Sequence, residues 1–177
     1  MSLLTIQTVE NAQGEVKEIF DEIEKMFGRV PNGIKQWSVS PNALKKQWES
    51  IKMRLSEDAQ TQKLHTIVRY LMSGENECEY CIGFNGAMLM NMFGMSLDEL
   101  ESLRNDPSSA PLDEKNKALL LFALQATKAP DEVNADHIST LKNMGITETQ
   151  MFDMVHAASH MYVVNTLFRT FKVEQDF

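Results

Sequence analysis

Apolar side chains recur every three or four residues in the N-terminal part of the chain. Residues 16–27 form a one-sided stripe of this kind, which stops before Gly28 and Pro31. The spacing predicts an amphipathic helix that ends at the glycine. Ser40 followed by Pro41 predicts the N-cap and first residue of a second long helix, because serine accepts orphan amides and proline fits a first turn.

The middle of the chain carries the next two helical patterns. Apolar residues at 64, 67, 68 and 71 predict a third helix that ends near residues 73–74. Residues 76–93 predict a fourth helix, with Asn76 as its N-cap and Gly94 as its terminator. Two cysteines fall in the first turn of this fourth helix, so it is where chemistry is expected.

The C-terminal part also shows helix starts and stops. Ser96 and Glu99 form a capping-box pattern that opens a short helix, and a proline-bounded loop at 106–111 ends it and separates two halves of the chain. No alternating apolar run with hairpin turns and no repeat is present, so the predicted fold class is all-α. The remaining predicted helices are residues 116–127, residues 134–144, and a long last helix opened by the capping-box pattern of Thr147 and Gln150.

The composition is that of an ordinary globular protein. The 177 residues fit one domain, so we predict a single domain over residues 1–177. A hydrophobic fraction of 43% is enough for a core, and the net charge of −8 argues against a nucleic-acid partner. No apolar run reaches the roughly 18 residues that a membrane span needs, and no basic leader is present. We therefore expect a soluble, cytoplasmic protein without a membrane partner.

The chain has only two cysteines, Cys78 and Cys81, in a Cys-x-x-Cys pattern. On the first turn of a helix this spacing brings the sulfurs within bridging range, and the helix N-terminus favours the reactive thiolate. Such a pair in a reducing compartment indicates redox or metal chemistry and argues against a structural staple. Spacing alone leaves both classes open, because zinc sites use the same pattern.

The residues around the cysteines carry a family resemblance. Residues 77–87 read ECEYCIGFNGA, which resembles the Cys-x-x-Cys-x-x-x-His segment of alkylhydroperoxidase D (AhpD) in the carboxymuconolactone decarboxylase superfamily. Val-Pro-Asn at 30–32 and Ser-Pro at 40–41 resemble the lead-in of its peroxidase-related branch, and the segment from 145 onward resembles the branch's closing helix. The resemblance covers about residues 15–173.

This resemblance implies a helical AhpD-like subunit that acts as a thiol-dependent peroxidase or disulfide reductase. Cys81 resembles the cysteine that a peroxide oxidises. Cys78 resembles the partner that closes the disulfide and meets a dithiol reductant, and a second thiol nearby traps sulfenic acid before overoxidation. Neither a cofactor nor a metal is implied. The architecture of the relatives implies a homo-oligomer, a trimer or a multiple of it.

Two positions depart from the family pattern. Asn85 stands where the family has the histidine of its proton relay. Because asparagine cannot transfer protons, we expect a low peroxidase activity, without the roughly 10²- to 10⁴-fold in rate that a proton-transfer group contributes. Thr66 stands where the family has a glutamate. The neighbouring His65 is a candidate general base, because imidazole titrates near neutrality, and ordinary packing is the alternative. The candidate catalytic residues are Cys78, Cys81, Asn85 and His65.

Other interpretations stay open. His156 and His160 lie one helical turn apart and, with the two cysteines, would complete a two-Cys, two-His zinc set. Either histidine could instead replace the relay missing at residue 85.

The acidic residues at 75, 77 and 79 would raise the thiol pKa, whereas the helix terminus would lower it. A different class keeps the fold without the redox cycle, as a ring-opening or decarboxylating enzyme or a helical ligand-binding protein.

Overall fold

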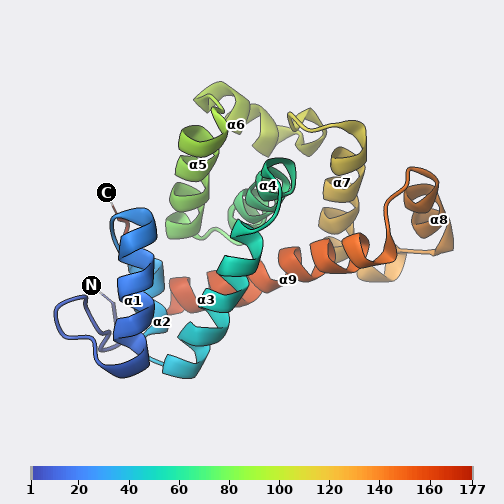
Figure 1. Cartoon of the computed structure of the whole chain (residues 1–177). Helices are drawn as coiled ribbons and strands as arrows, with labels where there is room; N and C mark the ends of the chain where they lie inside the picture. The colour runs from blue at the N-terminus through green and yellow to red at the C-terminus, as the bar shows by residue number, and fades with distance from the viewer. Residues whose placement is uncertain (1, 177) are drawn as a thin grey trace. The chain divides into compact units, whose positions relative to one another are not determined.

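The computed structural model describes residues 2–176, and every regular element in that range is helical (Figure 1). The all-α prediction is therefore confirmed. The α-helices are α1 (Gly14–Phe27), α2 (Asn32–Trp37), α3 (Pro41–Leu55), α4 (Ala59–Glu75), α5 (Glu79–Phe93), α6 (Leu97–Asn105), α7 (Glu114–Lys128), α8 (Ala135–Asn143) and α9 (Glu148–Thr170). Two 3-10 turns accompany them, η1 (Pro107–Ser109) and η2 (Pro130–Glu132).

The helices group into two compact units. The first contains the residues up to Glu57 together with those from Leu167 onward, and the second contains Asp58–Thr166. The loop at 106–111 lies inside the second unit, so the prediction that it separates two halves is wrong. The reason is packing, because α6 before the loop and α7 after it both contact α4. The single domain over residues 1–177 stays a prediction.

The first unit has an apolar core in which α1 packs against α3. The stripe predicted on residues 16–27 supplies one buried face, although Met26 and Phe27 at its end are exposed. Trp48 of α3 is buried, and its indole N–H donates to the Glu22 carboxylate at 2.6 Å. The buried apolar residues of this core are Ala12, Val16, Ile19, Phe20, Ile23, Val30, Leu44 and Trp48.

Side-chain caps begin several helices where the sequence predicts them. Ser40 accepts a backbone amide from the first turn of α3, and Pro41 is the first residue of that helix. The capping boxes predicted at Ser96 and Thr147 are both present. The short helix α2 is not predicted from the sequence, because the six residues after Pro31 are too few to show an apolar period.

In the second unit, α4 packs along α5 and is also contacted by α6 and α7 (Figure 1). It begins at Asp58, whose carboxylate accepts the amides of Gln60 and Thr61. Because α4 has neighbours on several sides, nine of its side chains are buried. The largest fully buried side chains of this unit are Leu64, Ile67, Val68, Met72, Leu89, Leu103, Leu120 and Ile146.

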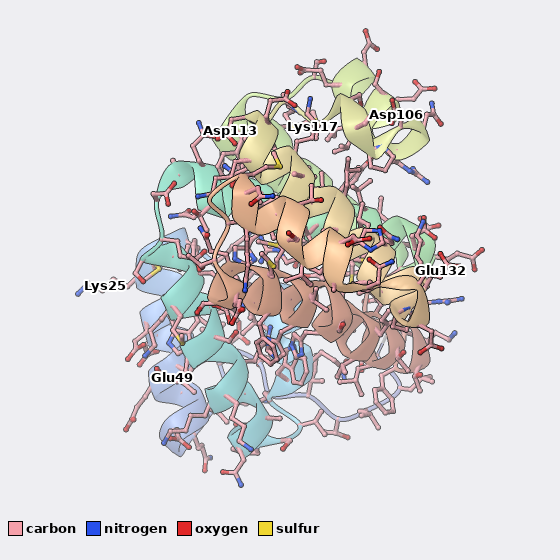
Figure 2. The ribbon with its side chains drawn as sticks, turned by 90° about the vertical axis from the view of Figure 1, so that its right-hand side faces the viewer. Lys25, Glu49, Asp106, Asp113, Lys117 and Glu132 are labelled. Carbon is pink, nitrogen blue, oxygen red and sulfur yellow. The ribbon has the colours of Figure 1, made fainter. Side chains whose placement is uncertain are left out.

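Charged side chains lie on the outside of both units. Figure 2 shows Lys25 and Glu49 of the first unit, and Asp113 and Glu132 of the second, projecting from the ribbon, and all four are exposed. Among the helices of residues 2–176, none is both long enough and apolar enough to cross a membrane.

Candidate active site

A three-residue turn joins α4 to α5 and positions the first cysteine. Asn76 is the C-cap of α4, Glu77 has a left-handed backbone with φ of 52°, and Cys78 is the N-cap of α5. The Cys78 amide donates to the Ser73 carbonyl at 3.0 Å, and the Glu77 amide donates to the Gly74 carbonyl at 3.1 Å. These two bonds form a Schellman motif with glutamate at the position that glycine usually occupies.

The predicted start of the site helix at Asn76 is therefore wrong. Asn76 closes α4, and α5 begins at Glu79, with Cys78 as its N-cap and Cys81 at its third position. The physical reason is that the chain needs the left-handed residue to leave one helix before the next can begin. Gly94 does end α5, as predicted, with φ of 67°.

The thiols of Cys78 and Cys81 contact each other in the reduced state. Both are free, and they are 1% and 3% exposed. The Cys81 thiol lies within hydrogen-bonding range of Cys78 and of the hydroxyl of Ser73, which is fully buried on α4. Ser73 Oγ donates to the Arg69 carbonyl at 2.6 Å. Two sulfurs and one hydroxyl thus form a small polar cluster where α4 contacts α5.

The environment of Cys81 disfavours its ionisation. Its hydrogen bond to Cys78 is the largest cause, and burial adds to it, so that the pKa of the Cys81 thiol lies well above its ordinary value. Negative charge on Cys78 raises this pKa further. The Ser73 hydroxyl acts in the opposite direction, because it can donate to the Cys81 sulfur. The pair therefore holds one negative charge far more readily than two.

Asn85 lies one turn after Cys81 on α5 and is buried. Its Nδ2 donates to the Cys81 backbone carbonyl at 2.8 Å. The amide therefore braces the backbone of the site helix, and it has no proton that titrates near neutral pH. The structure places Asn85 beside the cysteine backbone without supplying a relay.

Polar side chains of α4 reach the same helix contact. Thr66 Oγ1 donates to the Gln62 carbonyl at 2.8 Å, and Arg69 Nη2 donates to Thr66 Oγ1 at 3.1 Å. The same guanidinium nitrogen lies 3.9 Å from Met88 Sδ on α5. Thr66, at the position where the family has a glutamate, thus places a neutral hydroxyl beside the Arg69 guanidinium.

The sequence analysis did not single out Ser73 or Arg69. A signal was available in their spacing, since Thr66, Arg69 and Ser73 follow one another at three and four residues. Residues at this spacing share one face of a helix. A polar row on a buried helix indicates that its members have polar partners, and here Ser73 lies beside Cys81 while Arg69 bonds to Thr66.

His65 is buried on α4 at 7% exposure. The helical rise places it about 12 Å along the axis from Ser73, the α4 residue that contacts Cys81, and about 80° around the axis from it. His65 therefore lies about two helical turns away from the α4 residue nearest to Cys81. Its role as a general base stays a prediction.

The two C-terminal histidines lie together on α9. His156 and His160 stack with their ring centroids 6.3 Å apart. Among residues 2–176, no group of three or more His, Cys, Asp or Glu side chains could hold a metal ion, so the two-Cys, two-His set is not assembled. The acidic side chains at 75, 77 and 79 are exposed, and none is among the causes that shift the Cys81 pKa.

No protein-family model matches the sequence, and no curated protein matches it. Solved structures share its fold. An alkylhydroperoxidase AhpD core, an uncharacterized peroxidase-related protein from Ralstonia eutropha JMP134, aligns with a TM-score of 0.83 at 19% identity, covering 99% of this chain and 92% of the other. An uncharacterized peroxidase-related protein from Silicibacter sp. TM1040 gives 0.81 at 20% identity, covering 98% and 91%.

A third structure is a cysteine-to-alanine variant of the debrominase Bmp8 in complex with 2,3,4-tribromopyrrole. It aligns with a TM-score of 0.72 at 16% identity, covering 99% of this chain and 94% of the other. The chain therefore has an AhpD-like helical fold over nearly its whole length, which confirms the predicted fold. At such identities the likeness concerns the fold, so activity is argued from the site itself.

Proposed function

We propose that this protein is a thiol-dependent oxidoreductase that reduces a peroxide or a disulfide by cycling Cys78 and Cys81 between dithiol and disulfide. The observation that carries the proposal is that two free, buried thiols lie within hydrogen-bonding range of each other at the start of α5. Thiols already in contact need little movement to form a disulfide. A second thiol beside the first also traps the sulfenic acid that a peroxide forms.

The cycle balances with one peroxide and one dithiol reductant. A thiolate attacks a peroxide oxygen, the O–O bond breaks, and the departing oxygen takes a proton to leave as alcohol or water. The second thiol attacks the resulting sulfenic acid, which forms the S–S bond and releases water. The reductant then opens this disulfide by thiol–disulfide exchange and is itself oxidised to a disulfide.

The site supports this cycle at a low peroxidase rate. Asn85 supplies no titratable group, and Thr66 supplies a hydroxyl in place of a carboxylate. A positioned acid or base contributes roughly 10²- to 10⁴-fold to such a rate, and that contribution is missing at these positions. Both thiols are also buried, so a substrate reaches them only when the side chains around them move.

The structures of similar fold support a small-molecule enzyme of one of two kinds. Two of them are described as peroxidase-related proteins. The third is a debrominase with 2,3,4-tribromopyrrole bound, which favours a second candidate function. In that second candidate, this fold binds a small organic molecule, either as a non-redox enzyme or as a ligand-binding protein, and no disulfide cycle takes place.

Counting free thiols separates the two candidates. The reduced protein is treated with hydrogen peroxide and then with dithiothreitol, and thiols are counted after each step. A redox pair loses both thiols together and regains both, and Cys78→Ser or Cys81→Ser abolishes the intramolecular disulfide. Thiols that survive peroxide unchanged, or a metal ion bound through both cysteines, would contradict the redox proposal.

A further inference from the structure

Helix α9 carries a row of exposed side chains that the thiol site does not use. Phe152, His156, Ser159 and Val163 follow one another at four, three and four residues, and all four are exposed. Side chains at this spacing share one face of a helix. We propose that this face forms a zinc site shared by two copies of the chain, in which each copy supplies His156 and His160. The inference does not depend on the cysteine cycle.

The two histidines of this face have the spacing of a metal chelate. They lie one helical turn apart on α9, and their rings stack with the centroids 6.3 Å apart. Two histidines at this spacing share one helix face and can hold one zinc ion, with each nitrogen at about 2.0–2.1 Å from the metal. Rotation about the side-chain bonds of His156 and His160 turns one nitrogen of each ring toward a common ion.

One copy supplies only half of a structural zinc site, which takes four ligands. Within residues 2–176, no group of three or more His, Cys, Asp or Glu side chains could hold a metal ion, so the pair has no third ligand beside it there. Ala157 follows His156 at the position where a zinc protease has its glutamate base, so the pair is not suited to hydrolysis. A second copy brings the same two imidazoles, and together they make a set of four nitrogens.

The exposed face around the histidines is complementary to itself. A two-fold axis midway between His156 and Ser159 sets two α9 helices antiparallel, so that Phe152 of one copy faces Val163 of the other. Phe152 is 74% exposed and Val163 is 51% exposed, and covering them removes apolar surface from water. On the same axis His156 faces Ser159, whose small side chain leaves room for the rings. Apolar contacts thus flank a central group of four imidazoles.

Zinc titration of the full chain tests the shared site. Isothermal titration calorimetry with zinc chloride should give one ion for every two chains. Light scattering should show that saturating zinc at least doubles the mass measured in EDTA, and excess EDTA should restore the starting mass. One ion per chain, or a mass that zinc leaves unchanged, would overturn the proposal.

Single substitutions identify the ligands. His156→Ala and His160→Ala should each weaken zinc binding at least about tenfold and abolish the gain in mass, because each removes two of the four shared nitrogens. His137→Ala, which removes a histidine of α8, is the matched control and should change neither property. The double variant Cys78→Ser, Cys81→Ser should also bind zinc as the wild type does. Zinc binding that is lost in this double variant and kept in both α9 variants would place the ion on the thiols and overturn the proposal.

Ser159→Arg tests the contribution of the second copy. It keeps both histidines but places a long, charged side chain at the centre of the proposed contact. The gain in mass with zinc should therefore be lost, and the zinc affinity should fall at least about tenfold. Ser102→Arg, at an exposed position in α6, is the matched control and should behave as the wild type. A Ser159→Arg protein that still doubles its mass with zinc would show that the copies meet elsewhere and would overturn the shared site on α9.

Discussion

Replacing Glu77 by glycine should stabilise the protein, because this residue holds a left-handed backbone in the turn before Cys78. Its φ is 52°, and its amide and that of Cys78 donate to carbonyls in the last turn of α4. A Cβ makes this conformation unfavourable for an L-residue, whereas glycine adopts it readily. Glu77→Gly removes the Cβ and leaves both backbone bonds in place.

The size of the effect follows from a comparison with Glu77→Ala, which loses the same carboxylate but keeps the Cβ. A left-handed residue other than glycine costs about 1–2 kcal/mol. Glycine also lowers the unfolding free energy by about 0.4–1 kcal/mol relative to alanine, because it gives the unfolded chain more conformational freedom. The unfolding free energy of Glu77→Gly should therefore exceed that of Glu77→Ala by about 0.5–1 kcal/mol, or about 1–4 °C in melting temperature.

Differential scanning calorimetry of the reduced variants measures this difference. The matched control is Glu101, an exposed residue in the middle of α6, where the backbone is helical. At that position glycine should lower the unfolding free energy by about 1 kcal/mol relative to alanine, which is the opposite sign. A Glu77→Gly protein less stable than Glu77→Ala would refute the reasoning about the left-handed turn.

Four more outcomes are expected, three from the site and one from the exposed surface. The raised pKa of Cys81 stabilises the fold fully below about pH 8.5, where an unfolded thiol keeps its proton, and this stabilisation should be lost as the pH rises toward the raised value. Urea titrations from about pH 8 to 10 should thus show a steeper fall in unfolding free energy for the wild type than for Cys81→Ser. Asn85→His should raise turnover with an organic hydroperoxide at least about tenfold and add a pH dependence near neutrality, whereas an unchanged rate would show that residue 85 does not limit the reaction. In the companion variant His65→Ala, slower thiol oxidation would indicate that His65 acts as the general base. An unchanged rate would show that His65 takes no part in the reaction. The exposed Met90, Met92 and Leu97 near the end of α5 lead us to expect self-association, and the family resemblance implies a trimer or a multiple of it, so a 20.1 kDa monomer in light scattering would contradict this expectation.

Helix starts with side-chain caps could be predicted because the interactions that make them are local. Ser40 with Pro41, and the capping box of Ser96, need only groups within the first turn of their own helix. Asn76 shows where this reasoning stops. Asparagine suits both the start and the end of a helix, and the left-handed turn at Glu77 assigns it to the end of α4. The sequence alone does not distinguish these two uses.

The helical class, most of the caps and the placement of both cysteines at the start of one helix follow from the sequence, because each depends on residues within a few positions of one another. Only the tertiary structure shows that Ser73 reaches the Cys81 thiol, that Arg69 reaches Met88, and that burial adds to the effect of Cys78 in raising the pKa of Cys81. These contacts join α4 to α5, so they depend on the register and distance at which the two helices pack. That packing is the sum of many weak side-chain contacts from separate segments, and no pattern within either helix specifies it.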